Sequence, residues 1–137
     1  MHDGRPGTIG TDVVDVERLR RIRGRNPGRF DALAFTEPEI AYCRSKQHPE
    51  IHFAGHLAAK EATFKALRMR WEGPFSWRFL EVGHRTDGSP TVTLSSDGAR
   101  ALGKLPLQGL SVSIAHTDDV AIAVAWAPGE STTNHAD

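Results

Sequence analysis

The segment from about Ile51 to Met69 constrains the fold of this chain more than any other. Its spacing predicts a helix, and Gly73 and Pro74 follow as stop signals. One face carries an apolar stripe with a lysine inside it, namely Phe53, Leu57, Lys60, Phe64 and Leu67. A second seam holds Ala54, Ala58, Glu61, Ala62 and Lys65. Because small side chains let another backbone come close, we expect a neighbouring element to pack where Glu61 and Lys65 lie.

The N-terminal part of the chain predicts a strand and two helices. In the strand at 8–14, Ile9, Thr11 and Val13 alternate with Gly10, Asp12 and Val14, which puts Asp12 on one face. A helix is expected at 16–22, ended by the glycines and proline of RGRNPG. Thr36 and Glu39 then form a capping-box pattern that begins a second helix, in TEPEIAYCRS.

The C-terminal part predicts two hairpins separated by a short helix. RFLEVGHRTDGSPTVTLS is typical of two strands joined at Asp87-Gly88, and SSDGARALGK of a helix with a Ser or Asp cap. GLSVSIAHTDDVAIAVAW predicts the second hairpin, which turns at 118–119. One face of its first strand carries Leu110, Val112, Ile114 and His116, and one face of its second carries Val120, Ile122, Val124 and Trp126.

The expected fold class is therefore α+β, a single small domain with about five antiparallel-rich strands packed on a long helix and shorter helices. With 137 residues the chain is too short for two ordinary domains, so we expect one domain over 1–137. Its core spans about 8–127, and the polar segments 1–6 and 128–137 are expected to fray.

Composition narrows the possible functions. Lys plus Arg and Asp plus Glu number 17 each, so the total charge gives no support to a general polyanion-binding role. The single cysteine, Cys43, cannot form an internal disulfide. Nothing resembles a signal peptide or a membrane-spanning run, so we expect a cytoplasmic protein that contacts no membrane.

Asp12, Glu61 and Lys65 have both an ordinary and a functional interpretation. Glu61 and Lys65 could be a surface i,i+4 pair that contributes about 0.2–0.5 kcal/mol, and Asp12 could cap a helix or pair with an arginine. However, a carboxylate in a covered strand needs a partner, a cation or a proton. A second carboxylate on a helix packed against that strand would make an oxygen site suited to Mg²⁺, with Lys65 facing a phosphate.

The roles of two further groups of polar residues are not decided by the sequence pattern. His116 and Thr117 stand at a strand end and are either ordinary surface residues or hydrogen-bond donors to a phosphate or a reacting hydroxyl. An arginine run is either a solvated face or a docking patch for an acidic macromolecule. No aromatic residues are interleaved for base stacking, so an acidic protein is at least as good a partner as a nucleic acid. The run consists of Arg18, Arg20, Arg21, Arg23, Arg25 and Arg29.

Several stretches together resemble one protein family. GTDVVDVERLRRI, FTEPE, FAGHLAAKEATFKAL, DGSP and LSVSIAHTDDVAIAVA occur in the order and spacing of the holo-acyl-carrier-protein synthases, the small phosphopantetheinyl transferases. The resemblance covers about residues 8 to 126. Its specific part is the joint occurrence of the Gly-x-Asp strand, the Ala-Ala-Lys-Glu-Ala helix and the Ser-Ile-x-His-Thr strand.

The resemblance implies a Mg²⁺-dependent enzyme with a phosphopantetheinyl-transferase-like fold. Such an enzyme transfers 4′-phosphopantetheine from coenzyme A to a serine of an acyl or peptidyl carrier protein and releases adenosine 3′,5′-bisphosphate. It also implies a homotrimer with active sites between subunits. Fatty-acid, polyketide and peptide carriers all remain open as substrates, and no nucleic-acid partner is implied.

The resemblance also assigns roles to residues of this chain. Asp12 and Glu61 correspond to the Mg²⁺ ligands, and Lys65 to the cation beside the pyrophosphate. We further expect Glu61 to accept the serine proton as general base, directly or through a metal-bound water. We assign Lys60 to structure or to a salt link. Contacts to coenzyme A are implied for Lys65, His56, Gly88, Pro90, His116 and Thr117, and contacts to the carrier protein for Arg18, Arg21, Arg25 and Arg29.

Four positions depart from the pattern of the family. His56 stands where an arginine is common, Ser89 where a lysine is common, and Ala115 where a serine is common. Phe64 stands where a small polar residue would be unremarkable, and its bulk could reshape the pantetheine channel.

The two lost cations keep a second hypothesis open, a catalytically weak relative that binds carrier proteins through its arginines. A third hypothesis, a nucleotide- or nucleic-acid-binding domain, predicts tight, steeply salt-dependent binding to oligonucleotides.

Overall fold

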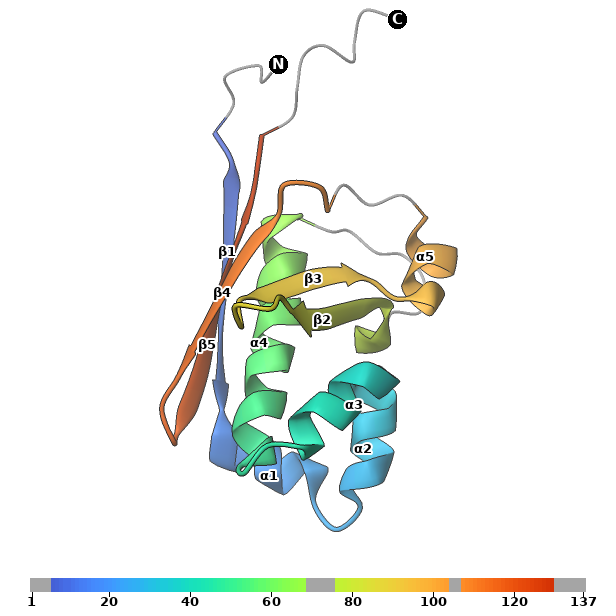
Figure 1. Cartoon of the computed structure of the whole chain (residues 1–137), viewed down its shortest axis with the longest axis vertical. Coiled ribbons are helices and arrows are strands. Elements are labelled where there is room, and N and C mark those ends of the chain that lie inside the picture. The colour runs from blue at the N-terminus through green and yellow to red at the C-terminus, as the bar shows by residue number, and fades with distance from the viewer. Residues whose placement is uncertain (1–5, 69–75, 104–106, 130–137) are drawn as a thin grey trace, which may run out of the picture.

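The computed structural model describes residues 6–68, 76–103 and 107–129, and the predicted frayed ends fall almost wholly outside them. Within these residues the chain follows the expected α+β order (Figure 1). The strands are β1 (Thr8–Asp15), β2 (Leu80–His84), β3 (Pro90–Leu94), β4 (Ser111–His116) and β5 (Val120–Ala127). The helices are α1 (Val16–Arg23), α2 (Pro27–Ala34), α3 (Glu37–Arg44), α4 (Pro49–Ala66) and α5 (Ser96–Leu102), with a 3₁₀ turn at Trp77–Phe79.

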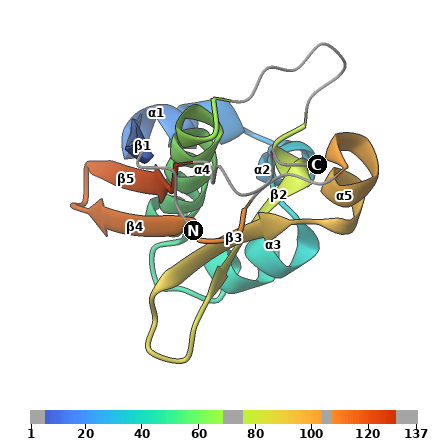
Figure 2. The same cartoon turned by 90° about the horizontal axis from the view of Figure 1, so that it is seen from above.

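All strand pairs among the described residues are antiparallel. The first sheet has the order β1-β5-β4, with Asp12 opposite Ala123 and Ala123 opposite Ile114. The second is the hairpin β2–β3, whose turn contains Gly88 at a φ of 90°. Seen from above in Figure 2, α4 lies between the three-stranded sheet and this hairpin, and it contacts strands of both. The long helix is therefore the centre of the domain.

The expected close approach occurs between α4 and the first sheet. Ala58 and Ala62 of α4 are fully buried against the alternate alanines of β5. Gly10 of β1 packs directly on the helix backbone, since a Cβ at this position would lie 2.0 Å from the carbonyl oxygen of Ala62. The small-residue seam thus brings the backbones of α4 and β1 together.

The side of β1 and β5 that faces away from α4 carries bulky side chains. On β5, alanines at alternate positions face α4, so the large residues between them face outward. Between 40% and 67% of the surface of each of these residues is exposed. We call this surface the outer apolar face, which consists of Ile9, Val13, Ile122, Val124 and Trp126.

The sequence expectation was wrong about one helix. Asn26 and Pro27 were interpreted as part of a stop signal, but the side chain of Asn26 accepts a hydrogen bond from the Arg29 amide and begins α2. Proline is well suited to the first turn of a helix, where its missing N–H is not needed. In addition, α4 ends at Ala66, earlier than the predicted Met69, which lies outside the described residues together with Gly73 and Pro74.

Two further observations bear on the expectations from composition. None of the helices in the described part of the chain is long and apolar enough to cross a membrane. Cys43 is buried, and this burial, assisted by the charges of Glu39 and Asp31, raises the pKa of its thiol to about 12. The thiol is therefore protonated at neutral pH and is part of the core rather than a nucleophile.

Candidate active site

Asp12 lies next to α4 because Gly10, two residues before it on β1, packs on the helix backbone. Residues two apart on a strand share a face, so the side chain of Asp12 follows Gly10 onto the helix and is only 19% exposed. Lys65 meets it from α4, with its Nζ 3.4 Å from Asp12 Oδ1 and 3.0 Å from the carbonyl oxygen of Thr11. The structure thus brings two of the three predicted charges into contact.

The third predicted charge is that of Glu61, which lies one helical turn before Lys65 on α4. Burial and the negative charge of Asp12 raise the pKa of Glu61, and the positive charge of Lys65 opposes them. Two carboxylates therefore repel each other beside a single ammonium group whose side chain is half exposed. A divalent cation would relieve this repulsion.

The donor set of this site fits Mg²⁺. Asp12 and Glu61 offer carboxylate oxygens, the ligands that this hard cation prefers. Among the described residues no cluster of three or more His, Cys, Asp or Glu has metal-binding geometry. An ion held by these two carboxylates would keep other coordination positions for water or phosphate oxygens, as Mg²⁺ commonly does in proteins.

His116 and Thr117 lie away from the carboxylate pair Asp12 and Glu61. His116 ends β4 and its ring meets that of His52 edge-on at a centroid distance of 6.0 Å. Because α4 rises about 1.5 Å per residue, His52 lies roughly 14 Å along the helix axis from Glu61. The Thr117 hydroxyl accepts from the amides of Asp119 and Val120, which leaves its own proton to donate. Within one chain, these two residues are not brought to the carboxylate pair.

His56, Gly88 and Pro90 lie around a histidine that the sequence analysis missed, His84. The Nε2 atoms of His56 and His84 are 3.1 Å apart, and His84 Nδ1 is 3.4 Å from the carbonyl oxygen of Gly88. Pro90 is the residue opposite His84 in the hairpin. A single histidine in a strand carries no local signal, although its alternation with Val82 could have placed it on the same face as that residue.

Lys60 has the structural role that we assigned to it. Its Nζ donates to Glu39 Oε1 at 2.5 Å and to the carbonyl oxygens of Ala34 and Trp77 at 3.0 Å. Glu39 also accepts from the amides of Thr36 and Val82. Burial alone would raise the pKa of Glu39, but the contacts with His56, Lys60 and Thr36 hold it below its ordinary value.

Glu39 therefore does more than close the capping box. Its carboxylate links α3, α4 and β2, which places Glu61 relative to the rest of the domain. A lysine inside an apolar stripe requires a buried acid, and this was the signal that could have identified Glu39 from the sequence.

Exposed arginines lie on α1, on the segment after it and at the start of α2. Arg20 donates to Glu17 at 2.5 Å, and we call the other four, Arg18, Arg21, Arg25 and Arg29, the basic face. Arg23 does not belong to it, because its guanidinium group forms a two-point contact with the buried Asp31 at 2.8 and 2.9 Å. Ile22 and Leu33 on α1 and α2 are also exposed. This part of the surface therefore combines positive charge with apolar side chains.

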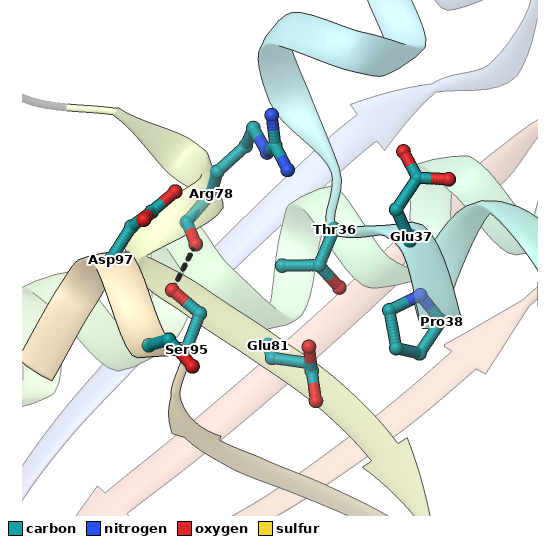
Figure 3. Close-up of a pocket in the computed structure, with 8 residues that line it drawn as sticks. Thr36, Glu37, Pro38, Arg78, Glu81, Ser95 and Asp97 are labelled. Atoms are coloured by element: carbon teal, nitrogen blue, oxygen red, sulfur yellow. Dashed lines mark hydrogen bonds between the residues drawn. The ribbon is translucent and has the colours of Figure 1, made fainter.

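A pocket elsewhere is not part of this constellation. Figure 3 shows it between the start of α3, the 3₁₀ turn with β2, and the start of α5, with the Ser95 hydroxyl donating to the carbonyl oxygen of Arg78. Its volume of about 210 Å³ is smaller than that of most ligand pockets, and its lining mixes Glu37, Glu81 and Asp97 with Arg78. No residue that the sequence analysis singled out for catalysis or cofactor binding lines it.

Comparison with known proteins agrees with the fold and with the motifs. Residues 8–125 match the family model of the 4′-phosphopantetheinyl transferase superfamily. The holo-[acyl-carrier-protein] synthase of Caldanaerobacter subterraneus subsp. tengcongensis is 36% identical over 88% of this chain and 94% of its own. That of Thermoanaerobacter sp. is 36% identical over 94% of this chain and 92% of its own.

Solved structures show the same likeness. The holo-[acyl-carrier-protein] synthase of Neisseria meningitidis superimposes with a TM-score of 0.71 at 27% identity, covering 88% of this chain and 96% of that one. The Helicobacter pylori synthase, solved in complex with coenzyme A, gives a TM-score of 0.69 at 30% identity, covering 85% and 96%.

Proposed function

Because the chain belongs to the holo-acyl-carrier-protein synthases of the 4′-phosphopantetheinyl transferase superfamily, we propose that it transfers 4′-phosphopantetheine from coenzyme A to a serine of an apo carrier protein. The observation that carries this proposal is the pair Asp12 and Glu61, which faces one ammonium group, that of Lys65, between β1 and α4. Two carboxylates and one cation suit a reaction on a pyrophosphate, in which an enzyme mainly positions reactants and neutralises charge.

The proposed step is a displacement at the phosphorus attached to pantetheine. The serine oxygen forms a bond to this phosphorus while the bond to the bridging pyrophosphate oxygen breaks, so adenosine 3′,5′-bisphosphate leaves with the electron pair. Glu61 accepts the serine proton, and its raised pKa makes it a stronger base than an ordinary carboxylate. Lys65 provides positive charge beside the pyrophosphate.

Asp12 and Glu61 would hold Mg²⁺, which supplies further neutralisation of the pyrophosphate charge. Lys65 is already oriented toward this place by the carbonyl oxygen of Thr11. For coenzyme A we propose contacts from Lys65, His56, Gly88, Pro90, His116 and Thr117.

We also propose that the enzyme is a homotrimer with its active sites between subunits. The outer apolar face supports this, because apolar surface that is contiguous and exposed usually marks an interface. The separation of His116 from Glu61 within one chain supports it as well, since a neighbouring subunit could bring the two together. Light scattering on a sizing column should give three copies for the wild type and one for Val124→Glu, which should also be inactive. An active wild-type monomer would contradict this assembly.

The basic face is the proposed docking surface for the acidic helix of the carrier protein. Ile22, next to Arg21 in the chain, is exposed as well, so charge and apolar contact are available together. Electrostatic docking of this kind acts on encounter with the carrier rather than on the chemistry of transfer.

The test is the mass of the carrier protein after incubation with coenzyme A and Mg²⁺, for a panel of fatty-acid, polyketide and peptide carriers. We expect a gain of one phosphopantetheine group on at least one carrier. Asp12→Asn and Glu61→Gln should abolish the gain and leave the fold intact, whereas Glu37→Gln, an exposed carboxylate remote from β1, should not. No gain on any carrier, with binding retained, would make the chain a carrier-binding module instead.

A further inference from the structure

Four histidines from three different elements gather on one side of α4. They are His52 and His56 of α4, His84 of β2 and His116 of β4, and we call them the histidine patch. His56 and Glu61 are five residues apart, which turns their side chains roughly 140° away from each other around the helix. The patch is thus separate from the Asp12–Glu61 pair and has different chemistry, with nitrogen donors in place of oxygen.

We propose that His56 and His84 bind a divalent transition-metal cation of the Zn²⁺ class between their Nε2 atoms. These atoms lie 3.1 Å apart. Two imidazole nitrogens that bind one tetrahedral Zn²⁺ at about 2.0–2.1 Å are about 3.3 Å from each other, so a small outward shift of either ring accommodates the ion. Since no group of three His, Cys, Asp or Glu among the described residues could hold a metal, water would complete the coordination of this ion.

The outer nitrogens of the two rings support this assignment. His56 Nδ1 is buried and has no hydrogen-bond partner among the described residues, although Glu39 Oε2 lies 3.3 Å away. His84 Nδ1 faces the carbonyl oxygen of Gly88 at 3.4 Å. Because the oxygens of Glu39 and Gly88 can only accept, these contacts favour the tautomers that carry the proton on Nδ1. Metal-bound histidines are usually held in this way, by a carboxylate or a carbonyl behind the ring.

This proton assignment leaves two Nε2 lone pairs pointing at each other. Such an arrangement is repulsive unless a cation lies between the nitrogens, and the cation is either a metal ion or a proton. Imidazoles with free Nε2 lone pairs are the form that binds a metal ion.

The surroundings hold both rings in place. The ring of Tyr42 stacks on His84 at 4.1 Å and on His56 at 5.4 Å, nearly parallel to each. Glu39 behind His56 is neutralised by Lys60, and the Nζ of Lys46 lies 4.5 Å from the centroid of the Tyr42 ring. His52, whose pKa burial lowers, and His116 complete the titratable groups around the pair.

The experiment uses the untagged full chain, stripped with a chelator and kept in excess Mg²⁺ so that the carboxylate pair is occupied. Zn²⁺ is titrated by calorimetry, and Co²⁺ is titrated by its visible absorption, which reports nitrogen ligation. We expect one high-affinity ion per chain and a higher melting temperature with Zn²⁺. His84→Phe, which keeps the stack on Tyr42, and His56→Gln should each weaken binding at least tenfold, whereas the exposed His48→Gln should not.

Nitrogen NMR of the histidine rings separates the two possible cations and does not depend on the variants folding. Zn²⁺ should shift the Nε2 resonances of His56 and His84 while both Nδ1 protons remain. The proposal is overturned if the wild type takes up no stoichiometric Zn²⁺. It is also overturned if the variants bind as tightly as the wild type, or if a proton is found on one Nε2 and Zn²⁺ does not displace it.

Discussion

Lys60 and Lys65 stand five residues apart on the same helix, and the structure predicts opposite consequences for their loss. Lys60→Met removes an ammonium group that is fully buried and bonded to Glu39, Ala34 and Trp77. Two carbonyl oxygens then lose a partner, and Glu39 becomes a buried charge without a counter-ion. Breaking one partner of a buried pair costs about 3–5 kcal/mol, a large share of the roughly 5–15 kcal/mol that stabilises a domain.

Lys65→Met is the matched control. The side chain of Lys65 is half exposed and its distance of 3.4 Å from Asp12 is long for an ion pair, so we expect its loss to cost no more than about 1 kcal/mol. This variant should nevertheless lose transfer activity, because the proposed cation beside the pyrophosphate is gone. Urea unfolding followed by circular dichroism measures the stability of both variants, and the carrier mass assay measures their activity.

The pH dependence tests the same reasoning. The pKa of Glu39 is lowered in the folded state, so its stabilising contribution is present above the ordinary carboxyl pKa of about 4.3 and is lost as pH falls through the folded value. Lys60→Met loses part of that contribution, so the gap between variant and wild type should narrow below about pH 4. A Lys60→Met variant that loses less than about 1 kcal/mol at pH 7, or as little as Lys65→Met, would refute the assignment of Lys60 as a structural anchor.

Three other predictions follow from single positions. The pKa of Glu61 is raised, so the stabilising contribution of its protonated form is full below the ordinary carboxyl pKa and is lost as pH rises through the folded value. At pH 7 the ionised form is unfavourable, so Glu61→Gln should melt slightly higher than the wild type in chelator, gain nothing from Mg²⁺, and be slower by about 10²–10⁴-fold. Gly10→Ala should lower the free energy of unfolding in urea by at least about 1–3 kcal/mol, because the alanine Cβ would clash with the Ala62 carbonyl oxygen. An unchanged free energy of unfolding would contradict the close packing of β1 on α4. Arg18→Glu should raise KM for the carrier about 5-fold with little change for coenzyme A, and Arg100→Glu on α5 should change neither; equal effects on both substrates would argue against docking.

The sequence predicted the elements whose signals are local. The alternation at 8–14, the Thr36–Glu39 capping box and the Asp87-Gly88 turn each depend on residues within a few positions, and all appear in the structure. The helix α2 was missed because Asn-Pro both ends and begins helices, and only the cap contact to Arg29 decides between them.

The features that the sequence did not predict depend on contacts between residues far apart in the chain. In the sequence Arg23 is indistinguishable from its exposed arginine neighbours, and only its contact with the buried Asp31 sets it apart. The role of His84 is recognisable only from its contact with His56, which lies 28 positions away in the sequence. The outward direction of the bulky residues on β5 follows from the small-residue seam of α4, which accepts only alanines opposite it.

The layer of alanines between α4 and β5 has a mechanical consequence. A methyl group has no rotamers, so this interface cannot absorb a displacement by rearranging side chains, as a layer of leucines would. Helix and strands must therefore shift together as one body, and the two carboxylates they carry keep their spacing through thermal fluctuation. We therefore expect adjustment to an incoming substrate in the β2–β3 hairpin, where amide hydrogen exchange should change most on binding.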